Sequence, residues 1–333
     1  MRAAVFEGEG RLVVRDVAEP TPGPDEVLVE VEACGICGSD VQIINVPPGH
    51  PSTPPVILGH EFVGWVRAVG TAVNDVPIGT RVVVDPDPKC GACESCRSGR
   101  PANCLNVVAL GVHRDGALAR YVTTPADTAY PISPDVSAEM ASLVEPLACV
   151  VNGTNRAAVR PGESVVVFGA GAIGCLFIAV FRGSGAGTIV AVEPSPARAD
   201  VARAVGADIV LAPDEWAARR SEILPRGADV VVDAVGSVLP QAIDAAGMGA
   251  RVVVFGMNGN ARPPVHQIDI VQKGLSILGS YISNFTFPAA IRLVERGRLN
   301  LAPMITAVIP VDETLAGIER LRSGEAVKIV IKP

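Results

Sequence analysis

The residues best suited to chemistry include four cysteines that lie close together, namely Cys90, Cys93, Cys96 and Cys104. The gaps between them are two, two and seven residues, and glycine, serine and proline lie in those gaps. Four thiolates at this spacing can surround one zinc ion tetrahedrally while the short loop wraps the ion. Because a four-sulfur shell leaves no open coordination position, the sequence predicts a structural zinc here. Disulfide pairing is the alternative, and it requires an oxidising compartment.

A second set of metal ligands is spread more widely along the chain. Cys37 lies in a Cys-Gly-Ser-Asp motif, His60 and Glu61 are neighbours, and Glu145 precedes a Pro-Leu pair. One thiolate, one imidazole and one or two carboxylates form a mixed shell with room for an exchangeable oxygen ligand, as a catalytic zinc requires. The spacing alone does not bring these residues together. Each of them therefore also has a purely structural interpretation, as a packed or surface side chain.

Residues 165–174 carry a pattern that is typical of dinucleotide binding. Strand-like Val165–Phe168 is followed by Gly-Ala-Gly-Ala-Ile-Gly and then by a helix-like stretch. In this context Gly169 permits a tight turn, and Gly171 lets the backbone approach a pyrophosphate at the helix N-terminus. Gly174 allows close packing of the helix on the strand. Ile173, within the same turn, is included in the predicted coenzyme site.

The next strand predicts which coenzyme binds. Glu193 ends that strand, where an acidic side chain accepts hydrogen bonds from the adenosine ribose and repels a 2′-phosphate. This favours NAD, and the nearby Arg198 keeps NADP as the alternative. Ligands of open parallel sheets bind beyond the carboxyl ends of the strands, which here predicts nicotinamide contacts from Gly256, Met257, Gly279 and Ser280.

The secondary structure expected around these residues differs between the two parts of the chain. Residues 1 to about 147 contain short strand-like runs broken by Pro and Gly, such as 27–31, 61–69 and 81–85. From about residue 163, strands rich in Val, Ile and Ala alternate with helices. That alternation predicts a parallel sheet covered on both faces. We therefore predict an α/β protein, with a β-rich domain and a doubly wound parallel-sheet domain.

Composition and charge exclude other classes of protein. The net charge is −7 and no basic block is present, so nucleic acid is not an expected partner. The longest apolar run, around residues 175–181, is too short to span a membrane. The first residues lack the features of a signal peptide, and we expect a reducing, cytoplasmic location. Cys34, Cys149 and Cys175 are then predicted to be buried free thiols.

The chain resembles the zinc-dependent medium-chain dehydrogenases over essentially its whole length, most closely the polyol and threonine dehydrogenase branch. The motifs that carry the resemblance are residues 37–40, residues 59–61, the four-cysteine loop and residues 169–174. The resemblance implies a GroES-like catalytic domain over 1–148, with a structural zinc lobe at about 86–106. It also implies a Rossmann domain over 149–284 and a return to the catalytic domain over 285–333. The active site is expected in the cleft between the domains.

The resemblance also implies roles for single residues. Cys37 and His60 are expected to bind the catalytic zinc, and Glu61 resembles the third ligand of the polyol branch. Glu145 stands where animal alcohol dehydrogenases have a cysteine ligand. Whether Glu145 binds zinc directly, through water, or in alternation with Glu61 is left open. Ser39 matches a hydroxyl that contacts the substrate alcohol.

Two positions, Gln42 and Asn152, depart from the family pattern. Gln42 stands where the family commonly has a histidine that passes the proton to solvent, and an amide does not titrate. The proton then leaves either through water or through another group such as His50. Asn152 also stands where relatives often have a histidine.

Together these observations predict hydride transfer between a secondary alcohol and NAD, with two zinc ions per chain. The Asn284–Pro288 stretch resembles the polyol branch and favours a polyol, cyclitol or amino alcohol as substrate. The alternatives are a zinc enzyme for simple alcohols, an NADP-linked carbonyl reductase, a zinc-free alkene or quinone reductase, and a non-enzymatic NAD-binding protein with a lost active site. A homodimer or homotetramer is expected through the edge strand near residues 276–279.

Overall fold

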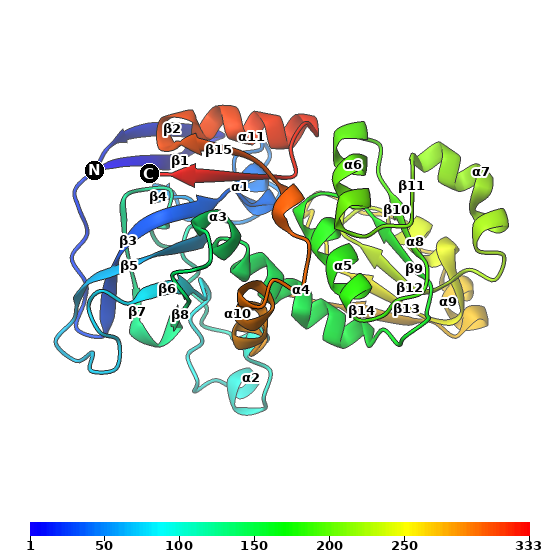
Figure 1. Cartoon of the computed structure of the whole chain (residues 1–333), viewed down its shortest axis with the longest axis horizontal. Coiled ribbons are helices and arrows are strands. Elements are labelled where there is room, and N and C mark those ends of the chain that lie inside the picture. The colour runs from blue at the N-terminus through cyan, green and yellow to red at the C-terminus, as the bar shows by residue number, and fades with distance from the viewer.

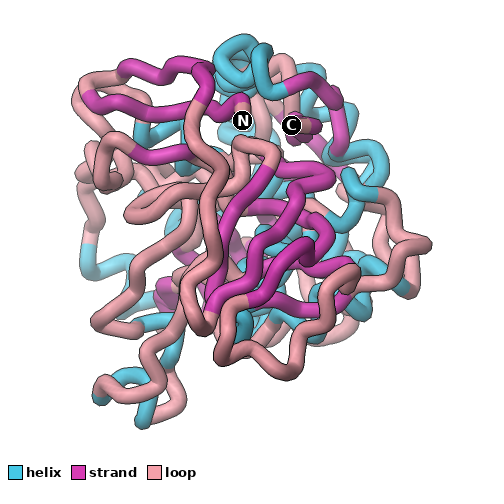
Figure 2. Tube along the Cα trace, turned by 90° about the vertical axis from the view of Figure 1, so that its left-hand side faces the viewer, coloured by secondary structure: helices cyan, strands magenta, loops and turns pink.

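The computed structural model describes residues 1–333 as two lobes joined side by side (Figure 1). The first lobe is built from strands and carries both chain termini, which lie near each other (Figures 1 and 2). The second lobe contains the parallel sheet. A small protrusion with helix α2 extends from the first lobe (Figure 1).

The first lobe holds a seven-stranded and a three-stranded sheet. In β3 (Glu26–Gly35), buried Val27, Val29, Val31 and Ala33 alternate with less buried residues, so one face of the strand meets the core. The other strands are β1 (Arg2–Gly8), β2 (Arg11–Asp16), β4 (Val56–Ile57), β5 (Glu61–Val69), β6 (Arg81–Val84), β7 (Tyr121–Pro125), β8 (Ala129–Pro131), β15 (Ile305–Pro310) and β16 (Lys328–Lys332). The helices are α1 (Gly38–Ile43), α2 (Glu94–Arg97), α3 (Ala138–Ala141) and α11 (Thr314–Ser323).

The second lobe is a six-stranded parallel sheet with the order β11-β10-β9-β12-β13-β14. Its central strand β9 (Val165–Phe168) is buried throughout, as expected for a strand covered on both faces. The other strands are β10 (Ile189–Val192), β11 (Ile209–Leu211), β12 (Ala228–Asp233), β13 (Ala246–Val254) and β14 (Ser276–Gly279). The helices are α5 (Ala172–Gly183), α6 (Pro196–Val205), α7 (Pro213–Ile223), α8 (Leu239–Ala245) and α9 (Gln267–Lys273). This strand order is that of a Rossmann fold, which confirms the predicted fold class.

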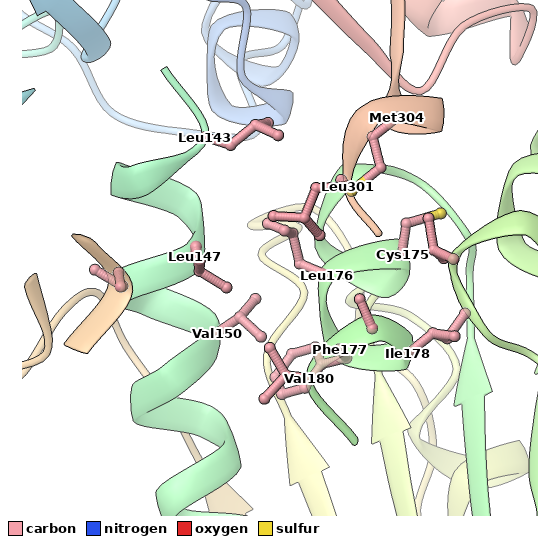
Figure 3. Packing of buried hydrophobic residues seen from close by; sticks show 14 of the residues in the cluster. Leu143, Leu147, Val150, Cys175, Leu176, Phe177, Ile178, Val180, Leu301 and Met304 are labelled. Atoms are coloured by element: carbon pink, nitrogen blue, oxygen red, sulfur yellow. The ribbon is translucent and has the colours of Figure 1, made fainter. Parts of the chain in front are cut away.

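Helix α4 (Val144–Ala157) packs against α5 and against α10 (Phe287–Glu295). Figure 3 shows Leu147 and Val150 of α4 facing Leu176 and Phe177 of α5, with residues 301–304 beside them. The same hydrophobic cluster includes Ala33, Val63 and Val83 of the first lobe. A single core therefore reaches from one lobe into the other.

The sequence patterns assign no element to residues 144–157. Pro146 and Gly153 argue against a helix in the sequence, because neither residue type favours a helix interior. Pro146 lies in the first turn, where its missing N–H costs nothing. At Gly153 a Cβ atom would lie 2.6 Å from Phe177 Cζ, so glycine permits the close approach of α4 to α5. The predicted limit between residues 148 and 149 falls inside α4, and the domain limits stay predictions. None of the helices is both long and apolar enough to cross a membrane.

Candidate active site and coenzyme site

A cavity of about 460 Å³ lies between the lobes. The first lobe contributes most of its polar wall, including Cys37, Ser39, Gln42, His50, His60 and Glu61. Helix α4 contributes Glu145 and Cys149, and the four-cysteine loop contributes Cys104 and Leu105. The Rossmann lobe contributes Ile173, Phe255, Gly256, Met257, Ser280, Tyr281 and Ile282. Residues that lie far apart in the sequence thus line one cavity between the lobes.

Cys37, His60 and Glu61 form a metal-ligand cluster in this cavity. Their ligand atoms all lie within 4.8 Å of one another. The reason is the sheet register, since Gly35 of β3 pairs with Glu61 of β5 and Cys37 follows two residues later at the start of α1. A thiolate, an imidazole and a carboxylate at this separation fit a zinc ion with an open position.

The buried carboxylate of Asp40 lies beside the imidazole of His60. Asp40 is fully buried, and its Oδ1 lies 3.9 Å from Nδ1 of His60. Neither atom has a hydrogen-bond partner within the chain. The other ring nitrogen of His60, Nε2, lies 3.3 Å from Oγ of Ser39. Metal-binding histidines commonly turn their second ring nitrogen toward a carboxylate, so the position of Asp40 also fits a zinc site.

Glu61 has a second partner that sequence reasoning missed. Lys328 of β16 forms an ion pair with Oε2 of Glu61, and each side chain is 1% exposed. The Nζ atom of Lys328 also donates to the carbonyl of Ile36 at 3.1 Å. Burial lowers the pKa of Lys328, but the Glu61 and Cys37 charges outweigh it and raise that pKa. Lys328 follows Glu61 by 267 residues, and only the pairing of β16 with β3 brings it close.

Glu145 lies in the same cavity but outside the set of atoms within 4.8 Å. Its Oε1 accepts a hydrogen bond from Sγ of Cys149 at 3.3 Å. Burial raises the pKa of Glu145 to about 8; the nearby charges of Glu61 and Asp87 act in the same direction, and His60 opposes them. Glu145 is therefore a second carboxylate close to the cluster. In this geometry it is less well placed than Glu61 to bind the same metal ion as Cys37 and His60.

The four thiols of Cys90, Cys93, Cys96 and Cys104 also lie within 4.8 Å of one another. Backbone and side-chain N–H groups point at the sulfurs. Asn106 Nδ2 donates to Sγ of Cys90 at 3.4 Å, and the amide of Cys93 donates to the same atom at 3.3 Å. These hydrogen bonds, that from Asn106 first, lower the pKa of Cys90 to about 6. All eight cysteines are free thiols, and this donor set fits a structural zinc.

The glycine-rich turn has the geometry that each glycine was expected to provide. Gly169 has a φ of +85°, and Gly171 is the N-cap of α5 with no atom within 4 Å of a Cβ position. At Gly174 a Cβ would lie 1.8 Å from the carbonyl oxygen of Gly169. The turn is therefore tight, closely packed on one side and open on the other, as a pyrophosphate site requires.

Glu193 and Arg198 lie beside this turn with their polar groups already engaged. The Glu193 carboxylate is buried and accepts from the amides of Ala170 at 2.7 Å and Ser195 at 2.9 Å. Nε of Arg198 donates to the carbonyl of Ala326 at 3.0 Å, and its Nη2 donates to that of Leu321. Arg198 therefore connects α6 to the last turns of α11 and to the segment that follows this helix.

The residues of the predicted nicotinamide end lie at or beside the cavity. Ile173, Gly256, Met257 and Ser280 line it. Gly279, the last residue of β14, does not, and the wall begins at Ser280.

Two zinc-ligand clusters beside a dinucleotide-binding sheet define a zinc-dependent dehydrogenase that uses NAD or NADP. Residues 23–134 match the model of the alcohol dehydrogenase GroES-like domain, and residues 172–296 match that of the zinc-binding dehydrogenases.

Curated relatives and solved structures support this class along the whole chain. An L-threonine 3-dehydrogenase from Caldanaerobacter subterraneus is 34% identical, covering 98% of this chain and 97% of the relative. D-arabinitol dehydrogenase 1 from Uromyces fabae is 32% identical, covering 100% and 97%. A zinc-binding dehydrogenase from Sinorhizobium meliloti, solved with NADP, has a TM-score of 0.94 at 35% identity, covering 100% and 99%. An alcohol dehydrogenase from Escherichia coli, solved with NADH, has a TM-score of 0.92 at 29% identity, also covering 100% and 99%.

The chain belongs to the zinc-containing medium-chain dehydrogenase/reductase family. It is an NAD(P)-dependent zinc dehydrogenase that acts on CH–OH groups, and the prediction of this class of enzyme is confirmed.

Proposed function

We propose that the protein oxidises a secondary hydroxyl of a small polyhydroxylated or amino-alcohol substrate with NAD, and reduces the ketone in the reverse direction. The observation that carries this proposal is the shared cavity. The Cys37–His60–Glu61 cluster and the expected nicotinamide contacts, Met257 and Ser280, line the same space. A hydroxyl carbon between them would meet both the metal and the coenzyme.

The substrate class rests on the cavity wall and on the relatives. Gln42, His50 and Tyr281 add hydrogen-bonding groups to the cavity of about 460 Å³, in which about half of the lining residues are hydrophobic. The names of the relatives describe enzymes for threonine and for arabinitol.

The residues of the chain would divide the work as follows. Cys37, His60 and Glu61 would hold zinc, with Glu145 as a further carboxylate, and the bound zinc lowers the pKa of the substrate hydroxyl. Ser39, whose Oγ already contacts the ring of His60, would accept the proton and pass it on. Hydride would move from the carbinol carbon to the nicotinamide.

His50 offers a route for the proton that Gln42 does not. It lines the cavity, and its Nδ1 lies 2.8 Å from the carbonyl of Pro51. The tautomer with the proton on Nδ1 donates to that carbonyl and leaves Nε2 as an acceptor. Burial lowers the pKa of His50, so the neutral ring dominates at pH 7. Water is the alternative acceptor.

The preference for NAD rests on Glu193. Its carboxylate stands at the end of β10 beside the glycine-rich turn, where it disfavours a second anion such as a 2′-phosphate. NADP stays the alternative, since one similar structure was solved with NADP and another with NADH.

Self-association through β14 is also part of the proposal. This strand ends the sheet and is largely exposed, and Ile277 of β14 and Val271 of the adjacent α9 are exposed apolar residues. An unpaired edge with apolar neighbours favours pairing with a second copy across a two-fold axis. Light scattering on the purified protein distinguishes monomer, dimer and tetramer.

A substrate panel tests the proposed function directly. The zinc-loaded protein is assayed for NAD and NADP reduction with polyols, cyclitols, amino alcohols and simple secondary alcohols. We expect the highest kcat/KM with a polyhydroxylated or amino-alcohol compound and NAD, and two zinc ions per chain by metal analysis. Higher kcat/KM with simple alcohols, or with NADP, would replace this proposal by one of the alternatives.

A further inference from the structure

The segment 280–286, which joins β14 to α10, has an unusual backbone. Its first three residues, Ser280, Tyr281 and Ile282, line the cavity. Ile282 has a φ of +42° and Phe285 a φ of +57°. The left-handed region is unfavourable for a β-branched residue such as isoleucine. Such strain persists only where surrounding contacts hold the backbone in place, and it is typical of functional sites.

One side chain supplies those contacts at the strained residue. Asn152 of α4 is 8% exposed. Its Nδ2 donates to the carbonyl of Ile282 at 2.8 Å and to the carbonyl of Tyr281 at 3.3 Å. An amide NH₂ group has two hydrogens, so both bonds form at once. The two carbonyls that flank the strained φ–ψ pair are therefore held by a single donor group.

Two further hydrogen bonds fix the rest of the segment. Thr286 Oγ1 donates to the carbonyl of Ala148 at 2.7 Å, and Ser283 Oγ donates to Oδ2 of Asp85 at 3.1 Å. Ala148 and Asn152 both belong to α4, the helix that also presents Glu145 to the cavity. Positions three and seven residues after Glu145 lie near the same face of a helix. One rigid element thus positions both a candidate zinc ligand and the wall formed by the segment 280–286.

We propose that Asn152 is a positioning residue that sets substrate specificity. By holding Ile282 in the left-handed region, it fixes Tyr281 and Ile282 as a wall of the substrate cavity. That wall offers one phenol hydroxyl and one apolar side chain to a small hydroxylated substrate. This inference rests on the cavity being the substrate site of the proposed dehydrogenase.

The test compares Asn152→Leu with Thr154→Val in the zinc-loaded enzyme. Leucine keeps the approximate size of asparagine and removes both donors. Thr154 is a matched control on the same helix, because its buried Oγ1 has no hydrogen-bond partner. Hydrogen–deuterium exchange of the peptide that covers 280–286 should become about five- to tenfold faster in N152L, and stay unchanged in T154V.

Kinetics then separate positioning from general destabilisation. In N152L we expect KM for the preferred alcohol to rise about tenfold, while kcat and the zinc content change less than about twofold. The ratio of kcat/KM between that alcohol and 2-propanol should fall about tenfold. A structural effect alone would lower activity toward both alcohols equally.

A double-mutant cycle with Ile282→Gly tests the role of the strained backbone. Glycine adopts a positive φ without penalty. In the I282G background, loss of Asn152 should therefore increase the mobility of the segment 280–286 less than it does in the wild-type background. The effect of N152L on the exchange rate should be at least about threefold smaller in the I282G background. Wild-type exchange and specificity in N152L, or additive effects in the cycle, would overturn the proposal. If the wild-type enzyme oxidises no alcohol of the panel, the proposed function fails, whereas the exchange data still decide whether Asn152 holds the segment.

Discussion

The ion pair between Lys328 and Glu61 predicts a large effect on stability. Both side chains are 1% exposed, so solvent does not screen them as it screens a surface salt bridge. Replacing Lys328 by Met keeps the apolar stem and leaves the Glu61 carboxylate buried without its cation. Removing one partner of a buried pair costs about 3–5 kcal/mol. The lost hydrogen bond to the carbonyl of Ile36 adds about 1 kcal/mol.

We therefore expect Lys328→Met to lower the free energy of unfolding by about 4–6 kcal/mol. Zinc-loaded protein should lie at the lower end of this range, because the bound cation partly neutralises Glu61. The K328M/E61Q double variant buries no unpaired charge, so it should be more stable than K328M by about 2 kcal/mol or more. Glu61→Gln alone completes the cycle.

Denaturant unfolding followed by circular dichroism measures the four free energies, and zinc analysis of each sample separates metal loss from loss of the ion pair. A K328M protein within about 1 kcal/mol of wild type would refute the reasoning, as would additive effects of the two substitutions.

Three further predictions concern the catalytic and coenzyme sites. Cys37→Ala should abolish turnover and remove one of the two zinc ions, while the Kd for NADH measured by fluorescence stays within about twofold of wild type. Loss of NADH binding would contradict a coenzyme site that is independent of the catalytic zinc site. Burial lowers the pKa of His50, so its neutral ring accepts protons at pH 7. His50→Gln should therefore slow alcohol oxidation about tenfold at pH 7 and less at pH 9. An unchanged pH–rate profile would assign the proton route to water. Glu193→Ala should raise the ratio of kcat/KM with NADP to that with NAD at least about tenfold, and a constant ratio would exclude Glu193 from coenzyme choice.

Features encoded locally were predictable from the sequence. The four-cysteine loop brings its ligands together over 15 residues, so spacing alone indicated the cluster that the structure shows. The strand before the glycine-rich turn and the helix after it were also predictable, because continuous Val runs and Gly positions mark them. β9 has the expected bounds, and β14 is the predicted sheet edge.

Features that depend on long-range register were not predictable. Lys328 meets Glu61 only because β16 pairs with β3, and nothing near Lys328 in the sequence marks a buried cation. Asn152 meets residues 281 and 282 across about 130 residues. Strand β13 begins at Ala246, earlier than the Val-rich stretch that starts at Arg251 suggests, because its first residues are glycine-rich and partly exposed.

The packing of α4 limits how the cleft between the two lobes can close. Its residues join the core that spans both lobes, and Gly153 brings it against Phe177 of α5 with no room for a side chain. Helix α5 begins directly after its N-cap Gly171, beside the expected pyrophosphate, while α4 presents Glu145 to the cavity and anchors the segment 280–286. Metal ligand, substrate wall and coenzyme turn are therefore connected through two helices in direct contact. Closely packed cores resist gradual deformation, so any closure of the cleft must keep this helix pair together.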